Sequence, residues 1–187
     1  GADLRNLTSV RGLDYDIRSR LEDQLVLREN FLSKFLGDKV IADVAVLGTD
    51  TFFREGAAVG VLFQAMSKAL LSTAINAQRN AAVRENPEVK ETKLEIAGRQ
   101  VSLIATPDNA IRSFYAVDGD FHLVTSSQAI VQRFFAAGTE KEALGNLPEF
   151  RYARSLMPVA REDTLFIYMS DPFFRLLVSP QYRVEMT

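Results

Sequence analysis

Apolar residues recur at helical spacing near the start of the chain. The repeat places leucine or isoleucine at every fourth position: Leu13, Ile17, Leu21 and Leu25. Charged residues fill positions between them, so one side of a helix would be apolar and the other would face water. Further leucine and phenylalanine residues extend the pattern to residue 36. It predicts an amphipathic helix over about residues 14–36.

Two short apolar runs follow at residues 40–47 and 57–63, and both contain several valines. Runs of this length and β-branched composition predict strands. Between residues 67 and 86 the spacing is helical again, and Pro87 ends this second helix because its ring disfavours helical conformation in Asn86. The residues predicted to face inward on it are Leu70, Leu71, Ala74, Ala77 and Ala81.

Four short segments then have the character of strands joined by turns. They cover residues 92–97, 100–106, 111–117 and 120–125. Gly98-Arg99 and Asp118-Gly119 lie at two of the joints, and Asp-Gly is typical of a two-residue hairpin whose central residues have positive φ. The pattern predicts an antiparallel meander. Charged and apolar residues alternate in the first segment, whereas the third is apolar on both faces, so we expect the third to be more central.

Helix signals dominate the rest of the chain. Residues 125–128 (TSSQ) have the spacing of a capping box, in which side chains bind the free amides at a helix start. Pro148 is placed as the first residue of another helix. We expect residues 164–169 to form the last strand and Asp171-Pro172 to begin a final helix. On the helix after the capping box, the residues predicted to face inward are Ile130, Val131, Phe134 and Phe135. On the helix that begins at Pro148, they are Phe150, Ala153 and Met157.

Strands grouped in a meander with helices packed outside it indicate an α+β fold rather than alternating βαβ units. A chain of 187 residues can bury about 70% of its unfolded surface in one core, so we expect a single domain over residues 1–187. Its first residue is Gly1 and its end lacks a polar tail, which favours a piece excised from a longer polypeptide.

Composition narrows the chemistry that we expect. Lys and Arg total 22 against 24 Asp and Glu, and a net charge of −2 argues against a nucleic-acid binder. The absence of cysteine excludes disulfides, thiol nucleophiles and cysteine-based metal sites. One histidine cannot supply a site with two imidazoles. No stretch is long and apolar enough to span a bilayer, and no phosphate-binding or dinucleotide-binding glycine motif is present. We therefore expect no metal and no cofactor.

His122 is the one residue around which a catalytic site could be built. It precedes Ser126 and Ser127 by four and five residues, so a hydrolase with a serine, a histidine and a carboxylate is one alternative. The Gly-x-Ser-x-Gly motif is missing, and helix capping also explains the hydroxyl groups. A partly exposed strand histidine with a satisfied hydrogen bond is the simpler interpretation, and we expect no catalytic residues.

Two other groups of residues suggest ligands less directly. Asp43, Asp50 and Glu55 could act as paired carboxylates or as oxygen ligands of a hard cation, but turns and helix caps use the same residues. Phenylalanine pairs at residues 52–53, 134–135 and 173–174 could line the cavity of an apolar-ligand carrier, which is a further alternative. Such pairs are more often part of a core.

Three segments carry a resemblance to a known family. They are residues 114–127 (FYAVDGDFHLVTSS), 147–150 (LPEF) and 165–168 (LFIY). Their order resembles a bacterial domain family of unknown function, with a strand, an Asp-Gly turn, a strand ending in serines, a helix, a second helix start and a strand. The resemblance is best over the last third of the chain. Related domains occur in large proteins thought to be exported or membrane-tethered, which implies a cell-envelope location, although the residues themselves do not exclude the cytoplasm.

These observations predict a non-catalytic scaffold or binding domain of a larger bacterial cell-envelope protein. Its partner would be another protein or the rest of the parent chain, which we expect to contact a sheet edge or an apolar patch. The binding residues are not identified by any motif in the sequence.

Overall fold

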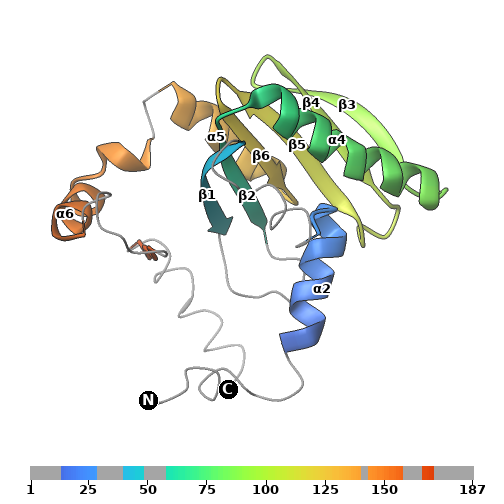
Figure 1. Ribbon diagram of the computed structural model, residues 1–187, viewed down its shortest axis with the longest axis horizontal. Helices are drawn as coiled ribbons and strands as arrows, with labels where there is room; N and C mark the ends of the chain where they lie inside the picture. Colours follow the sequence, from blue (N-terminus) through green and yellow to red (C-terminus); the bar gives the residue numbers. More distant parts are fainter. Residues whose placement is uncertain (1–13, 29–39, 49–57, 140–142, 158–165, 171–187) are drawn as a thin grey trace, which may run out of the picture.

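The computed structural model describes residues 14–28, 40–48, 58–139, 143–157 and 166–170. Within them, one six-stranded sheet is accompanied by helices, so the predicted α+β fold is confirmed (Figure 1). The strands are β1 (Ile41–Gly48), β2 (Val59–Ala65), β3 (Lys90–Ile96), β4 (Arg99–Ala105), β5 (Arg112–Asp118) and β6 (Phe121–Thr125). The helices are α2 (Asp14–Leu25), α4 (Lys68–Glu85), α5 (Gln128–Gly138), the 3-10 helix η2 (Leu144–Asn146) and α6 (Pro148–Leu156).

The sheet has the order β1-β2-β6-β5-β4-β3, and all neighbouring strands are antiparallel. β3 to β6 form the predicted meander, and β5 lies inside the sheet while β3 lies at an edge, as expected. The β1–β2 hairpin joins the meander through β2 and β6, with Phe63 opposite His122. This joint, which we call the β2–β6 seam, pairs strands that are far apart in the sequence.

Two predicted turns are displaced by one residue. Ile96 pairs with Arg99, so the central residues of the first turn are Ala97 and Gly98, both with positive φ (53° and 74°). Asp118 likewise pairs with Phe121, which makes Gly119 (φ 60°) the first central residue of the second turn. The Asp118 carboxylate forms an ion pair with Arg99 of β4, which is consistent with its position at the end of β5.

The N-terminal helix is shorter than predicted. α2 ends at Leu25, because Val26 has a left-handed φ of 54° and the Leu27 amide bonds back to the Glu22 carbonyl at 3.0 Å. Leu25 and Leu27 are both buried in the same core. Residues two positions apart on a helix point in different directions, so a helix that continued through residue 27 would not bury both. The predicted helical residues from 29 to 36 lie outside the described residues.

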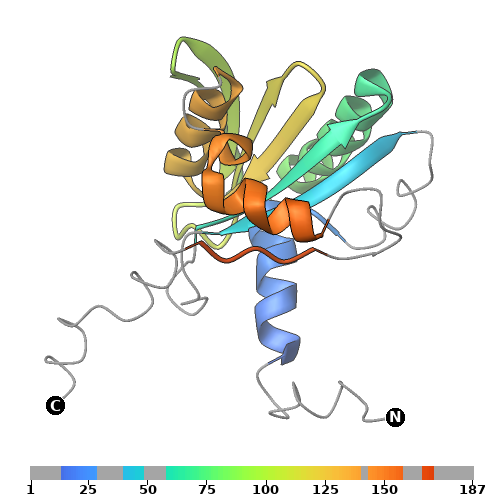
Figure 2. The ribbon, with the colours of Figure 1, turned by 90° about the vertical axis from the view of Figure 1, so that its left-hand side faces the viewer.

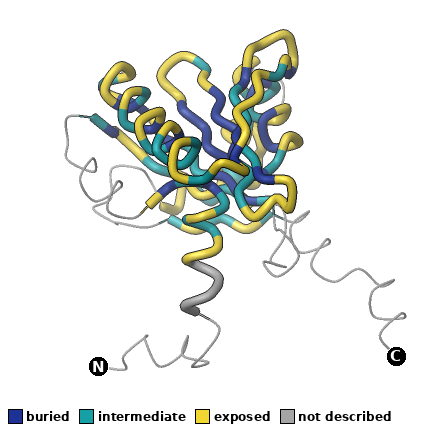
Figure 3. The backbone as a smooth tube through the Cα atoms, turned by 90° about the vertical axis from the view of Figure 1, so that its right-hand side faces the viewer, coloured by how far each residue is buried: buried dark blue, intermediate teal, exposed yellow. Residues whose placement is uncertain are grey.

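Two hydrophobic cores lie on opposite faces of the sheet. α2 and α4 contribute to one, and α5 contributes to the other (Figure 2). The buried positions are concentrated on the inner strands (Figure 3). The prediction for the inward face of α4 is partly wrong, because Leu70 and Ala77 are exposed. The buried residues of α4 are Leu71, Ile75 and Arg79. The expected face of α5 is confirmed, with Ile130, Val131 and Phe135 buried and Phe134 packed against the core.

The predicted capping box at α5 is wrong. Ser127 is the N-cap residue and makes no side-chain capping bond. The Thr125 hydroxyl instead donates to the Val59 carbonyl at 2.7 Å, and the Ser126 hydroxyl accepts from the Val59 amide at 3.2 Å. Both hydroxyls are buried and bind the start of β2, while the Thr125 hydroxyl also accepts from the Ser127 amide at 3.2 Å.

Pro148 is the first residue of α6, as predicted. Phe150 and Ala153 are half-buried, but Met157 is 48% exposed and does not face inward. The strand expected at residues 164–169 is not formed over its described part, because residues 166–169 do not join the described six-stranded sheet. Asp171 and Pro172 lie outside the described residues.

Candidate functional site

The most polar part of the interior is built around Arg79 on α4. Its side chain is 3% exposed, and its guanidinium donates to the carbonyl and hydroxyl oxygens of both Ser113 and Ser102 at 2.8–3.1 Å. The Ser102 hydroxyl donates to Glu91 of β3 at 2.8 Å, and the Ser113 hydroxyl donates to the Leu25 carbonyl at 2.8 Å. Burial lowers the pKa of Arg79 to about 10, which still leaves it charged at neutral pH. This network ties α2, α4 and strands β3 to β5 together.

Sequence reasoning missed Arg79, because one arginine on a helix has no local signal of burial. Only the facing serines on β4 and β5 distinguish it from the exposed arginines of the chain. The periodicity Leu71, Ile75, Arg79 is the one signal that could have revealed it, since the three residues repeat every four positions.

His122 lies in a second buried polar group on the same sheet face. Its Nδ1 is 2.8 Å from the Tyr115 hydroxyl, which also lies 3.2 Å from the Ser72 hydroxyl of α4. The imidazole is 0% exposed, and its Nε2 has no hydrogen-bond partner among the described residues. Burial, together with the nearby Lys68 charge, lowers the pKa of His122, while Asp120 opposes this effect. Its ring is therefore neutral at pH 7.

The structure does not bring His122 to Ser126 or Ser127. Residues four apart on an extended strand are separated by roughly 13 Å, and His122 bonds to Tyr115 while Ser126 bonds to Val59. Ser127 lies at the start of α5, one residue further away. The expectation of a partly exposed histidine is wrong, because Phe63 and the core around it bury the ring completely.

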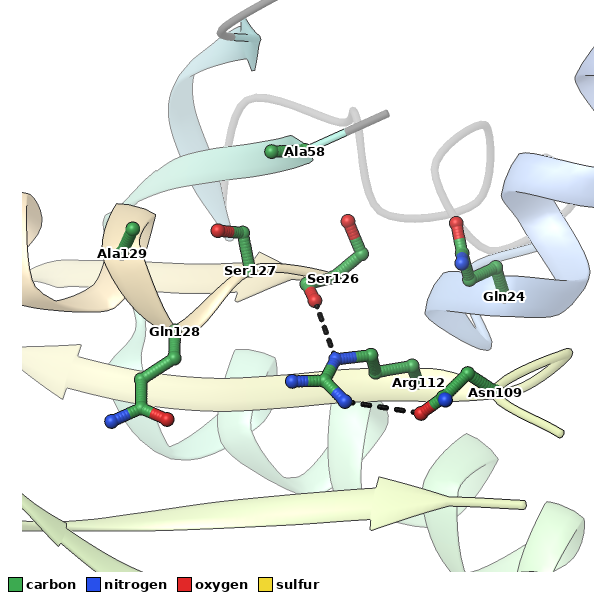
Figure 4. Close-up of a pocket in the computed structure, with 8 residues that line it drawn as sticks. All are labelled: Gln24, Ala58, Asn109, Arg112, Ser126, Ser127, Gln128 and Ala129. Atoms are coloured by element: carbon green, nitrogen blue, oxygen red, sulfur yellow. Dashed lines mark hydrogen bonds between the residues drawn. The ribbon is translucent and has the colours of Figure 1, made fainter. Parts of the chain in front are cut away.

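A pocket of about 470 Å³ opens at the start of α5 (Figure 4). Arg112 lies in it, with Nε donating to the Ser126 carbonyl at 3.1 Å and a terminal nitrogen donating to Asn109 at 3.0 Å. The lining residues are Gln24, Ala58, Asn109, Arg112, Ser126, Ser127, Gln128 and Ala129. Because most of them are polar, the pocket suits a small polar molecule better than the apolar ligand of a carrier.

The other predicted groups are scattered or lie outside the described residues. Asp43 is on β1, whereas Asp50 and Glu55 are outside the described part of the chain. Of the phenylalanine pairs, only Phe134 and Phe135 are described, and both pack in the core. Among the described residues, no three side chains of the metal-binding types come together.

The two edges of the sheet differ in composition. β3 carries four charged residues among seven: Lys90, Glu91, Lys93 and Glu95. β1 carries one charged residue, Asp43, among eight. No described residue pairs with the outer side of β1, and Val46 in its middle is 74% exposed. An apolar unpaired strand offers a row of amides and carbonyls on which another extended chain can pair.

Comparison with protein-family models, with curated proteins and with solved structures gave no match for this chain. The resemblance noted above therefore stays a prediction. Within the described residues, no helix combines the length and apolar character needed to cross a membrane.

Proposed function

We propose that this chain is a non-catalytic protein-binding or scaffold domain that accepts an extended segment of a partner protein on the outer side of β1. The observation that supports it is the unpaired, nearly uncharged strand β1 at one edge of a sheet whose other edge is heavily charged. Soluble proteins normally protect their edge strands with charges or bulges, and residues 44–48 of β1 have neither, which is typical of a binding surface.

The structure of β1 supports a strand as the bound partner. Its register with β2 is continuous from Asp43 to Gly48, with one irregularity between Ile41 and Asp43. A partner strand would pair through main-chain hydrogen bonds, while Val44 and Val46 contact its side chains on one face and Ala45 and Leu47 on the other. Affinity would depend on strand formation more than on a particular motif.

Charge adds a preference. Asp43 is the one charge on β1, so a partner strand with a lysine beside it is favoured over one with a glutamate. An exposed pair of this kind contributes about 0.2–1 kcal/mol, which corresponds to at most about fivefold in affinity.

The proposal is tested with a labelled peptide of sequence Lys-Thr-Val-Thr-Val-Thr-Val-Lys and its counterpart with glutamates at both ends. Fluorescence anisotropy should give a dissociation constant on the order of 10–100 μM for the basic peptide and weaker binding for the acidic one. Val46→Lys should weaken binding of the basic peptide by up to about fivefold, because it places a like charge on the exposed edge. Thr92→Lys on β3 is the matched control and should bind like the wild type. Equal affinity in Val46→Lys and wild type would refute the proposal.

The non-catalytic part of the proposal is supported by the separate hydrogen bonds of His122 and Ser126. A p-nitrophenyl ester assay comparing wild type with His122→Gln should give the same background rate for both. A rate that disappears in the His122→Gln variant, with its fold intact by circular dichroism, would favour the hydrolase alternative.

Membership in a larger bacterial cell-envelope protein rests on the resemblance of the last third of the chain. Fractionation of cells expressing the parent protein, followed by detection of this domain, tests it. Recovery in the soluble cytoplasmic fraction would contradict it.

A further inference from the structure

Residues 166–169 have the exposure pattern of a strand but pair with no strand of the described sheet. Phe166 and Tyr168 are half-buried against Phe150 of α6, with ring centroids 6.2 and 5.0 Å apart, whereas Ile167 and Met169 are 70% and 52% exposed. Such alternation is typical of a strand packed on one face. The side chains are apolar or aromatic, which also favours strand structure.

The same part of the molecule leaves a large apolar surface open. We call residues 148–157, which include α6, and residues 166–170 together the C-terminal unit. None of the residues of α6 is buried, and Tyr152, Leu156 and Met157 are 68%, 63% and 48% exposed in the described structure. Apolar side chains gathered on one unit in this way normally lie against another surface.

β1 is the edge strand on the side of the C-terminal unit. In Figure 1 the unit lies beyond β1, on the side away from β3, and Figure 2, viewed from that side, places it in front of the sheet. The unpaired strand pattern and the unpaired edge therefore lie on the same side of the molecule. The residues between α5 and η2, 139–143, span up to roughly 17 Å when extended, which allows the unit to approach β1.

We propose that residues 166–169 dock on β1 of the same chain as a seventh strand, with α6 covering one face of β1. Docking would give the outer amides and carbonyls of β1 partners in the same molecule and would bury Val46 together with exposed side chains of the C-terminal unit. The chain then alternates between the open edge described above and a closed edge. That closure regulates partner binding rests on the proposed function, whereas docking itself does not.

Engineered disulfides test the docking directly, because the chain has no cysteine of its own. Ile167→Cys is combined with Ala45→Cys in one variant and with Val46→Cys in another, since neighbouring β1 residues point to opposite faces. A disulfide requires Cα atoms within about 7 Å, so one of the two pairs should oxidise within the monomer. The control combines Ile167→Cys with Thr92→Cys on the far edge β3 and should oxidise at least tenfold more slowly.

Non-reducing electrophoresis separates the outcomes of this experiment. A faster-forming disulfide inside the monomer supports the proposal. No faster oxidation than in the β3 control would overturn it. Disulfide-linked dimers in place of monomers would also overturn it, because they identify a second copy as the occupant of β1.

Hydrogen exchange gives an independent measurement without cysteines. Ile167→Pro removes an amide and disfavours a strand at an exposed position, so outer amides of β1 should exchange at least tenfold faster than in wild type. Ile167→Thr keeps the strand preference and should leave their exchange unchanged. Protection of β5 reports that both variants are folded. Unchanged exchange of β1 in Ile167→Pro contradicts docking.

The peptide experiment separates this proposal from the proposed function. If docking of residues 166–169 competes with a partner, Ile167→Pro should bind the basic peptide more tightly than wild type. The dissociation constant should fall by a factor equal to one divided by the fraction of wild-type molecules in which β1 is open. A monomer disulfide, combined with no peptide binding even by the open-edge variant Ile167→Pro, supports docking and refutes the proposed function. Peptide binding without the disulfide supports the proposed function and refutes docking.

Discussion

The outer strands β1 and β3 lie at opposite edges of the same antiparallel sheet, but they differ in charge and in their links to the interior. β3 has charged residues at four of its seven positions, and one of them, Glu91, is linked through Ser102 to the buried Arg79. β1 has one charged residue and a central valine that is 74% exposed. The difference teaches that charge at an edge can act in two ways: charged side chains disfavour pairing with a further strand, and Glu91 links β3 to the interior through Ser102.

The largest effect is expected at the anchored edge. Arg79→Ala removes four hydrogen bonds from a buried network and leaves serine groups without their donor, so the free energy of unfolding should fall by about 3 kcal/mol. Urea denaturation measures it. Arg84→Ala, at an exposed position of the same helix, is the control and should change it by less than about 0.5 kcal/mol. Equal urea midpoints for the two variants would show that the hydrogen bonds of Arg79 do not stabilise the fold.

Acid should weaken the β2–β6 seam that joins β1 and its hairpin to the meander. The unfolded chain takes up a proton on His122 near pH 6.5, whereas burial lowers the pKa of His122 in the folded chain. The unfolded state therefore binds more protons as pH falls below 6.5. Stability should drop by up to about 1.4 kcal/mol per pH unit until the lower folded pKa is reached.

Urea midpoints at pH 7.5 and 5.5 measure this loss, and His122→Gln should show a smaller difference between the two. Charged groups near the imidazole are Lys68 of α4 and Asp120, which also pair with each other at 2.7 Å. A wild-type midpoint that stays constant over this range would show that His122 does not resist protonation.

A smaller effect is expected from crowding the same seam. A Cβ on Gly60 would lie 3.1 Å from Cβ of Thr125 and 3.3 Å from Cδ1 of Leu123, both in β6. Gly60→Ala should reduce the free energy of unfolding by about 1 kcal/mol, because these buried neighbours must shift. Gly145→Ala, where a Cβ meets nothing within 4 Å, is the control in a thermal melt. If Gly60→Ala were more stable than wild type, the neighbouring side chains of β6 would have accommodated the added methyl group without strain.

Exchanging the character of the two edges should have the smallest effect on stability. Val46→Lys and the double variant Lys93→Val with Glu95→Val change exposed positions, so each should shift the free energy of unfolding by less than about 0.5 kcal/mol per substitution. Light scattering at increasing protein concentration should reveal association of the β3 variant and none of Val46→Lys. A β3 variant that stays monomeric would show that charge is not what protects β3.

The meander could be predicted because its information is local. Glycine turns and period-two patterns identified four strands and their order, and the apolar third segment correctly indicated a central position. The pairing of β2 with β6 could not be predicted, because nothing near Phe63 specifies His122 as its neighbour. The capping box failed for the same reason: Thr125 and Ser126 found a buried partner in Val59, which lies far away in the sequence.

By itself the sequence determined the six strands of the sheet, the positions of helices α4, α5 and α6, and which chemistries the composition disfavours. These depend on side chains only a few positions apart. The tertiary structure alone decided that Arg79 and His122 are buried, that β1 is an uncovered edge and that residues 166–170 stay out of the sheet. Burial and strand pairing depend on contacts between distant residues, and no local pattern carries that information.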